Sequence, residues 1–187
     1  YAVSPTGADH CHSLHDTGME NATEEGFNPH GGLRSQGVIE PIPLADLGPQ
    51  KVRAFKHSTI AAVVPNCVAI CSFPGWNMRE LSQIVRAATG WDVTEYELLR
   101  VGERALTLAR VFNMREGLTV EDDRLPERSY GPTHGGALAE GGIDREELRE
   151  AIHTYYAMMG WEKESGVPTV EKLEELGVGW AAAYLPK

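Results

Sequence analysis

The sequence predicts an all-α fold, an irregular helical bundle, from three observations. Apolar residues recur at steps of three and four in several segments, which is the spacing of a buried helix face. Capping residues begin these segments, and glycine or proline follows them. No segment alternates apolar and polar residues over more than a few positions, so we expect no sheet.

The first of these segments spans residues 49–64, and we expect its helix to end where Pro65 forbids continuation. The second helix is expected at about 77–89, closed by Gly90 as a C-cap. The third begins with the capping box of Thr94 and Glu97 and is about six turns long. Its expected inward face carries Leu98, Val101, Ala105, Leu108, Ala109 and Phe112.

A fourth helix is expected to begin at Asp144, and a short final helix spans 169–176 and stops at Gly177. The fourth helix carries Leu148, Ile152, Tyr155, Tyr156 and Met159 on its apolar positions. We interpret the aromatic series of Tyr155, Tyr156, Trp161 and Trp180 as core and helix-capping material, and His57 and His153 as structural.

The expected organisation has two parts. Residues 1–48 form a loop-rich site segment with short helices, since seven Gly and five Pro lie between Tyr1 and Pro49. Residues 49–187 form the helical domain, interrupted by a long polar loop at about 117–142. A loop of that length is either disordered or functional.

Composition excludes several classes of function. With 17 basic and 27 acidic residues the formal charge is −10, which argues against nucleic acid as a partner. No apolar run approaches the roughly 20 residues of a membrane span. Three cysteines suit a reducing cytoplasm better than a disulfide framework. Because the chain begins at Tyr1 without an initiator Met, we expect it to be processed or cut from a longer polypeptide.

Two clusters could carry chemistry. Residues 7–16 contain three His, one Cys and two Asp, which could ligate a metal such as zinc through His10, Cys11, His12 and His15, transfer a proton, or form a plain polar loop. In residues 66–71 two cysteines stand four apart, so they can share a helical face, and thiolates are the ligands of iron-sulfur clusters. A cluster needs about four such ligands, and simple packing of small buried cysteines is the alternative.

In their order along the chain, these segments resemble the C-terminal region of the aldehyde ferredoxin oxidoreductase family. The opening Ser-Pro-Thr-Gly-Ala-Asp-His of residues 4–10 is similar to the family's Gly-Ala-(Cys/Asp)-His segment. The resemblance implies that His10 is the catalytic residue that assists proton transfer beside the metal. It also implies that His12 holds the place of a basic residue facing the pterin, and that Pro5 contributes to cofactor binding.

The second cluster is similar to the family's Asp-x-x-Gly-Leu-(Cys/Asp) pterin motif. By this correspondence Cys71 supplies the fourth thiolate of a [4Fe-4S] cluster, and Cys67 falls at a variable position, which favours packing for it. Ile70 replaces the leucine, Asn66 stands in place of the acid, and Ala69 stands in place of the glycine. The implied cofactor-binding residues of this segment are Asn66, Ile70, Cys71 and Ser72.

Two further segments extend the resemblance. Residues 125–128 and the following Gly-rich loop resemble the family's loop near the substrate channel, and residues 155–177 resemble its final helix pair. The implied activity is oxidation of an aldehyde to a carboxylic acid at a tungsten- or molybdenum-pterin (tungstopterin or molybdopterin) centre, with electrons passing through the cluster to ferredoxin.

The same resemblance implies a partner: an upstream, N-terminal pterin-binding part of the same polypeptide that carries the other three cluster cysteines. We therefore expect this chain alone to be inactive and to bind neither cofactor, since one thiolate of four cannot offset the cost of ordering the site. The alternatives are a helical zinc-binding domain and an electron-transfer interaction module without catalytic activity.

Overall fold

The computed structural model of the chain describes residues 1–7, 13–15, 19, 38, 40–136 and 139–186. Over these residues the fold is helical, and the β structure consists of an isolated bridge between Trp161 and Pro168. The predicted all-α class is therefore confirmed. In chain order the elements are α1 (Pro49–Cys67), α2 (Met78–Thr89), α3 (Glu95–Arg115), the 3-10 turns η3 (Val120–Asp122) and η4 (Glu127–Tyr130), α4 (Arg145–Met159), α5 (Val170–Glu175) and the 3-10 helix η5 (Gly179–Tyr184).

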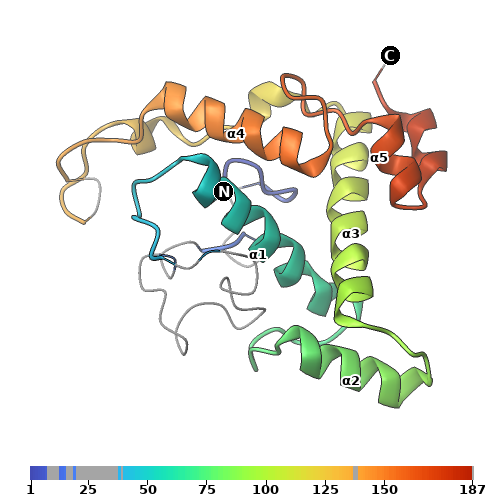
Figure 1. Ribbon diagram of the computed structural model, residues 1–187. Coiled ribbons are helices and arrows are strands. Elements are labelled where there is room, and N and C mark those ends of the chain that lie inside the picture. The colour runs from blue at the N-terminus through green and yellow to red at the C-terminus, as the bar shows by residue number, and fades with distance from the viewer. Residues whose placement is uncertain (8–12, 16–18, 20–37, 39, 137–138, 187) are drawn as a thin grey trace.

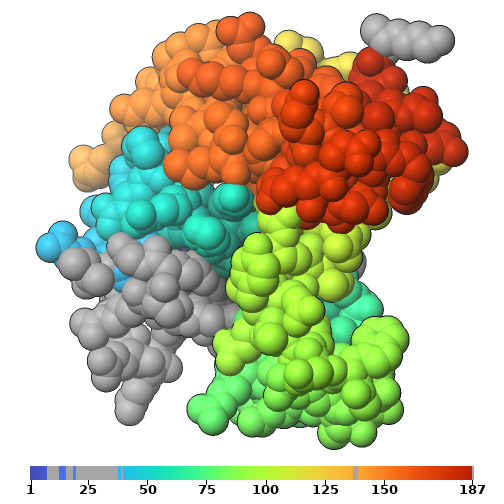
Figure 2. All heavy atoms as spheres, turned by 45° about the vertical axis from the view of Figure 1, so that its right-hand side comes forward, coloured from blue at the N-terminus to red at the C-terminus, as the bar shows by residue number. Residues whose placement is uncertain are grey.

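Helix α3 organises the bundle. Helix α1 packs against α3 and α4, α2 packs against α3, and α5 packs against η5, which also contacts α3 (Figure 1). The C-terminal elements, orange to red, gather at one end of the molecule, and green α2 lies at the other (Figure 2). A main core cluster joins α1, α3, α4 and Trp161, and a second joins the end of α1 to α2 and the start of α3.

At Gly102, helices α1 and α3 cross in direct backbone contact. A Cβ atom at position 102 would lie 2.3 Å from the carbonyl oxygen of Ile60, and 3.1 Å from a methyl carbon of Val64. No side chain fits between two helices at that separation, so only glycine allows this crossing.

Helix α1 continues through Pro65 to Cys67, so the expectation that it ends at Pro65 is wrong. Proline cannot donate the hydrogen bond that the carbonyl four residues earlier would accept. The side chain of Pro65 is fully buried, as is that of Val64. Burial of these two side chains offsets the missing hydrogen bond, and the backbone N–H of Val68 closes the final turn on the Val64 carbonyl at 3.1 Å.

The capping signals lie where the sequence places them. Asn77 and Glu80 form a capping box at the start of α2, Thr94 and Glu97 form another at the start of α3, and Asp144 caps α4. Gly90 ends α2 in the left-handed conformation with φ 75°. Capping is local chemistry, which explains why the sequence alone predicts it.

The buried face of α3 differs from the predicted one. Phe112 is 54% exposed, whereas Glu103 and Arg110 are buried. Glu103 is buried because it is paired: Arg100 Nη1 lies 2.5 Å from one of its carboxylate oxygens, and Lys172 Nζ lies 2.6 Å from the other. These contacts join α3 to α5, so charge pairing, and not the apolar pattern alone, sets the face that α3 buries.

The aromatic series is also only partly core. Tyr155, Tyr156 and Trp161 are buried, as predicted, but Trp180 on η5 is 66% exposed, so the expectation for it is wrong. Its ring contacts that of Tyr184, with centroids 6.3 Å apart. The small residue Ala181 fills the buried position of this turn instead.

Between α3 and α4, the described part of the polar loop forms the two turns η3 and η4. Its end is fastened to α4: the backbone N–H of Ile143 donates to the Ser129 carbonyl at 2.9 Å, and the Arg145 guanidinium lies 3.8 Å from the centre of the Tyr130 ring. Arg145 also pairs with Glu127. These contacts give η4 a defined place beside the start of α4.

Replacing Gly102 by alanine tests the crossing. The added methyl group meets a backbone oxygen, which no rotamer change can relieve, so we expect Gly102→Ala to lower the free energy of unfolding by about 3 kcal/mol. Gly131→Ala is the matched control, because its backbone is extended and nothing lies within 4 Å of the added atom. Urea unfolding followed by circular dichroism measures both variants, and equal stabilities would contradict the close crossing.

Candidate functional site

The end of α1 and the loop that follows it carry the implied cofactor-binding residues at 66–72, and the turn that joins them has a defined geometry. The backbone N–H of Ala69 donates to the Asn66 carbonyl at 3.2 Å, and that of Ile70 donates to the Pro65 carbonyl at 2.9 Å. This is the Schellman arrangement that ends many helices. It places Ala69 in the left-handed region with φ 56°, where glycine is the usual residue. The backbone at 69 therefore adopts a glycine-like conformation although the residue is alanine.

The loop presents its thiols outward. Cys67 and Cys71 are free and exposed, as are Asn66 and Ser72. The expectation that Cys67 packs as a small buried residue is therefore wrong, because the last turn of α1 presents it to the outside. The Trp76 indole N–H donates to the Cys71 carbonyl at 2.9 Å, which fixes the backbone that carries the thiol.

Apolar contacts hold the loop in place. Ile70, with Val68 and Trp76, packs partly buried against the core cluster that contains Leu98 at the start of α3. Phe73 points the other way and is 96% exposed. The loop thus has one face held by the bundle and one face that offers a thiol, a hydroxyl and an aromatic ring to the outside.

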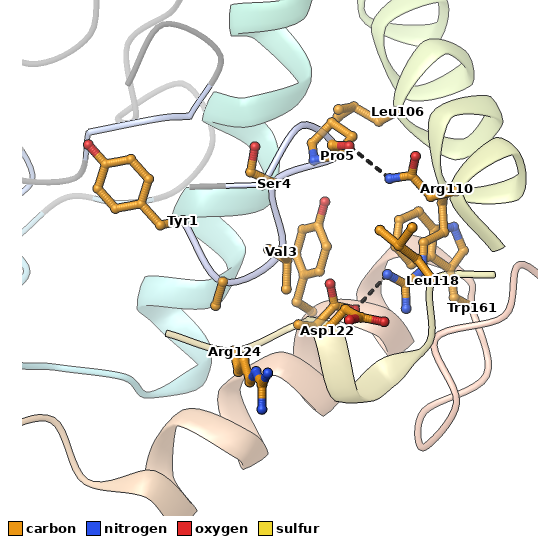
Figure 3. A pocket seen from close by; sticks show the side chains of 15 residues that line it. Tyr1, Val3, Ser4, Pro5, Leu106, Arg110, Leu118, Asp122, Arg124 and Trp161 are labelled. Atoms are coloured by element: carbon orange, nitrogen blue, oxygen red, sulfur yellow. Dashed lines mark hydrogen bonds and ion pairs between the residues drawn. The ribbon is translucent and has the colours of Figure 1, made fainter. Parts of the chain in front are cut away.

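The N-terminal segment 1–7 is fastened near the other end of α3. Its turn is closed by the Gly7 N–H donating to the Ser4 carbonyl at 3.1 Å. The side-chain amide of Asn113 donates to the Pro5 carbonyl at 2.8 Å, a contact between residues 108 positions apart (Figure 3). Ala2 and Val3 pack on the main core cluster. Pro5 is therefore held firmly against α3.

Arg110, Asp123 and Tyr156 form a buried cluster beside this segment. Arg110 Nη1 lies 2.6 Å from Asp123 Oδ2, and Arg110 Nε donates to the Gly166 carbonyl at 3.1 Å. The Tyr156 hydroxyl donates to the same Asp123 oxygen. Burial raises the pKa of the Asp123 carboxyl, and the Arg110 guanidinium opposes that rise. The cluster ties η3, α3 and α4 together.

A small cavity lies between segment 1–7 and this cluster (Figure 3). Its volume is about 80 Å³. It is lined by Tyr1, Ala2, Val3, Ser4, Pro5, Gly7, Leu106, Arg110, Asn113, Leu118, Asp122, Asp123, Arg124, Tyr155 and Trp161. Sequence reasoning did not predict this cavity; the one available signal is Arg110, a charged residue among the apolar positions of α3.

The predicted site residues that the structure describes fall in two separate places. Asn66 lies in the last turn of α1, Ile70, Cys71 and Ser72 lie in the loop that follows it, and Pro5 lies in segment 1–7. His10, Cys11 and His12 lie outside the described residues; His15 is exposed, with its ring centroid 6.0 Å from that of Tyr1. The two described places contact α3 at Leu98 and Asn113, 15 residues apart, which is about 22 Å along a helix. The described residues do not bring Pro5 to Cys71.

The described residues carry no complete metal site of their own. No group of three or more His, Cys, Asp or Glu side chains among them could hold a metal ion. No helix among them is both long enough and apolar enough to cross a membrane. A metallocluster at Cys71 would therefore draw its other ligands from elsewhere.

Comparison with known proteins gives a family match over residues 1–178, described as aldehyde ferredoxin oxidoreductase, domains 2 and 3. The tungsten-containing aldehyde ferredoxin oxidoreductase of Pyrococcus furiosus is 34% identical over 118 residues, covering 58% of this chain and 18% of the relative. A Pyrococcus furiosus protein named aliphatic sulfonate oxidoreductase, WOR-like subunit, is 32% identical over 121 residues, covering 60% of this chain and 19% of the relative. The chain thus spans about a fifth of the length of these relatives.

Among solved structures, the active site complex BamBC of benzoyl coenzyme A reductase, in complex with 1,5-dienoyl-CoA, matches with a TM-score of 0.59. The match covers 78% of this chain and 21% of that chain at 21% sequence identity. At this identity the likeness concerns the fold, which is shared over most of the described bundle.

The turn at residue 69 yields a test. A left-handed conformation costs an L-residue with a Cβ roughly 1–2 kcal/mol, so we expect Ala69→Gly to raise the free energy of unfolding by about 1 kcal/mol. Ala109→Gly, in the middle of α3, is the opposite control and should lower it by about the same amount. Chemical denaturation measures both variants; a destabilised Ala69→Gly would show that the turn does not adopt this conformation.

Proposed function

The chain belongs to the aldehyde ferredoxin oxidoreductase family, and we propose that it is the helical C-terminal part of an enzyme that oxidises aldehydes to carboxylic acids. The family match over residues 1–178 supports the proposal, as does the name of the Pyrococcus furiosus relative. The structural observation that carries it is the exposed Cys71 thiol on a fixed loop, at the position where the family motif has its cluster ligand.

The proposed cofactors are a tungsten- or molybdenum-pterin and a [4Fe-4S] cluster. Cys71 fits as one thiolate of the cluster, because its thiol is exposed and its backbone is held by Trp76. The remaining thiolates and the second face of the pterin site are assigned by the proposal to an upstream part of the same polypeptide. When bound, the two groups supply the redox chemistry and pass electrons to ferredoxin.

The residues of this chain would bind and orient. In the proposal, the exposed side chains of Asn66 and Ser72 offer hydrogen-bonding groups to the pterin, and Ile70 anchors the loop to the core. The left-handed backbone at Ala69 turns the chain sharply between the exposed Asn66 at the end of α1 and the exposed thiol of Cys71. Pro5 begins the second contact segment, which Asn113 holds in place.

His10 is proposed as the group that moves a proton at the attacked carbonyl, with His12 beside the pterin. Imidazole suits the step because its unperturbed pKa lies near neutrality. The proposed substrate is a small aldehyde. A relative of similar identity is named for an aliphatic sulfonate, so the aldehyde itself is part of the proposal and is tested with it.

His10→Gln in the complete polypeptide tests this assignment. We expect aldehyde oxidation with a ferredoxin acceptor to fall by about 10²–10⁴-fold, while the tungsten or molybdenum and iron contents stay unchanged. His153→Gln is the matched control, because His153 lies on α4 and takes no part in the proposed cofactor or substrate contacts. The isolated 187-residue chain serves as the cofactor-free control and should contain almost no iron or tungsten. Full activity of His10→Gln would refute the catalytic role.

A further inference from the structure

We propose that Phe73 is the anchor by which this chain docks against the polypeptide that supplies the other thiolates of the cluster. The proposal rests on the proposed function, because it takes Cys71 as a cluster ligand. It adds to that function an apolar contact between two parts of the protein, beside the cofactor.

Phe73 is the most exposed large apolar side chain among the described residues. It is 96% exposed, whereas the next most exposed, Trp91 and Tyr96, are each 69% exposed. Single apolar residues are common on protein surfaces. A phenylalanine that keeps almost its whole side chain in water, however, gains little from the fold that carries it. Nearly all of its apolar area remains available for burial by a partner.

Two hydrogen bonds hold the backbone that presents Phe73. The Gly75 N–H donates to the Ser72 carbonyl at 3.0 Å, which closes a turn with Phe73 in its middle. Gly75 itself lies in the left-handed region with φ 74°. Across the same loop, the Trp76 indole N–H donates to the Cys71 carbonyl at 2.9 Å. A side chain presented by an ordered turn loses little conformational freedom on binding, which favours docking.

The turn is also fastened to the bundle. Trp76 packs partly buried against the core cluster that contains Leu81 and Leu98. Asn77 then caps α2, and Met78, the first residue of that helix, is buried. Phe73 therefore projects from a loop whose far end is fixed by packing.

Proximity to Cys71 identifies the partner. Two residues of backbone span at most about 7 Å, so the backbone of Phe73 lies close to that of the proposed ligand. A [4Fe-4S] cluster needs about four thiolates. The part of the chain that the structure describes holds no group of three His, Cys, Asp or Glu side chains that could complete such a site. A polypeptide that brings the other thiolates to Cys71 would therefore lie against Phe73.

The chemistry of the turn suits an apolar partner surface. Phe73 carries no charge and no hydrogen-bonding side chain, and the adjacent Pro74 is exposed and lacks a backbone donor. Together they offer an apolar patch that fits an apolar pocket. Since solvent exposure helps to set the reduction potential of an iron-sulfur cluster, burial of this patch would also keep water from the Cys71 side of the cluster.

Variants of the complete polypeptide, loaded with its cofactors, test the anchor. We expect Phe73→Ser to raise the rate at which an iron(II) chelator removes iron by about tenfold or more, because truncation of a buried aromatic anchor weakens an interface by that much. The reduction potential of the cluster, measured by EPR titration, should rise, because water that enters stabilises the more negative, reduced form. Phe73→Leu keeps most of the apolar area and should recover most of the parent's behaviour.

Trp180→Ser is the matched control, because Trp180 is also an exposed aromatic residue but lies on η5, at the end of the molecule away from α2 (Figure 2). It should leave both quantities unchanged. If the parent retains its cluster and Phe73→Ser equals it in iron loss and in potential, the anchor is overturned while the proposed function stands. A parent without iron would overturn the proposed function and the anchor with it.

The 187-residue chain separates docking from folding. Because Phe73 is almost fully exposed, we expect Phe73→Ser to leave the midpoint of urea unfolding of this chain unchanged. A lowered midpoint would show that Phe73 stabilises the chain itself, and would overturn the docking role. Analytical ultracentrifugation should give the same oligomeric state for the variant and the parent. A parent dimer that Phe73→Ser converts to a monomer would show that a second copy of the chain covers Phe73, and would also overturn the proposal.

Discussion

The direct contact between α1 and α3 at Gly102 is the constraint on which the rest of the bundle depends. Because the two backbones meet, the end of α1 is fixed beside the start of α3, and the loop that carries Cys71 is fixed with it. Helix α3 then runs to Asn113, which holds the N-terminal segment. One helix thus contacts both the loop that carries Cys71 and the segment that carries Pro5.

Local signals explain how much of the fold could be predicted. The capping boxes at Asn77 and Thr94 involve residues within one helical turn, so they can be recognised from the sequence. The helical conformation of Pro65 and the exposure of Phe112 depend on tertiary packing: Pro65 is fully buried, and its neighbour Val64 belongs to a cluster formed with α2 and α3. Arg110 is buried because Asp123 lies beside it, and no periodicity encodes that pairing.

The candidate site, like the fold, could be predicted only where its residues are neighbours in sequence. The Cys71 loop is continuous in sequence, so a motif could identify it, and the left-handed conformation of Ala69 matches the glycine that the motif has there. The cavity under segment 1–7 could not be predicted, since residues from four distant segments line it. Trp161, in particular, reads as a core residue in the sequence, and only the structure reveals its unpaired N–H.

The exposed thiol of Cys71 is the structural feature on which the proposed function depends. The role of Cys71 as a cluster ligand is tested most directly by the iron content and the EPR spectrum of the reduced cluster. Both are measured in the complete polypeptide and compared between Cys71→Ser and Cys67→Ser. Both thiols are exposed and stand four residues apart, so the two variants differ only in the proposed ligand. The account predicts that Cys71→Ser loses or converts the [4Fe-4S] cluster and that Cys67→Ser keeps it. An unchanged cluster in Cys71→Ser would contradict it.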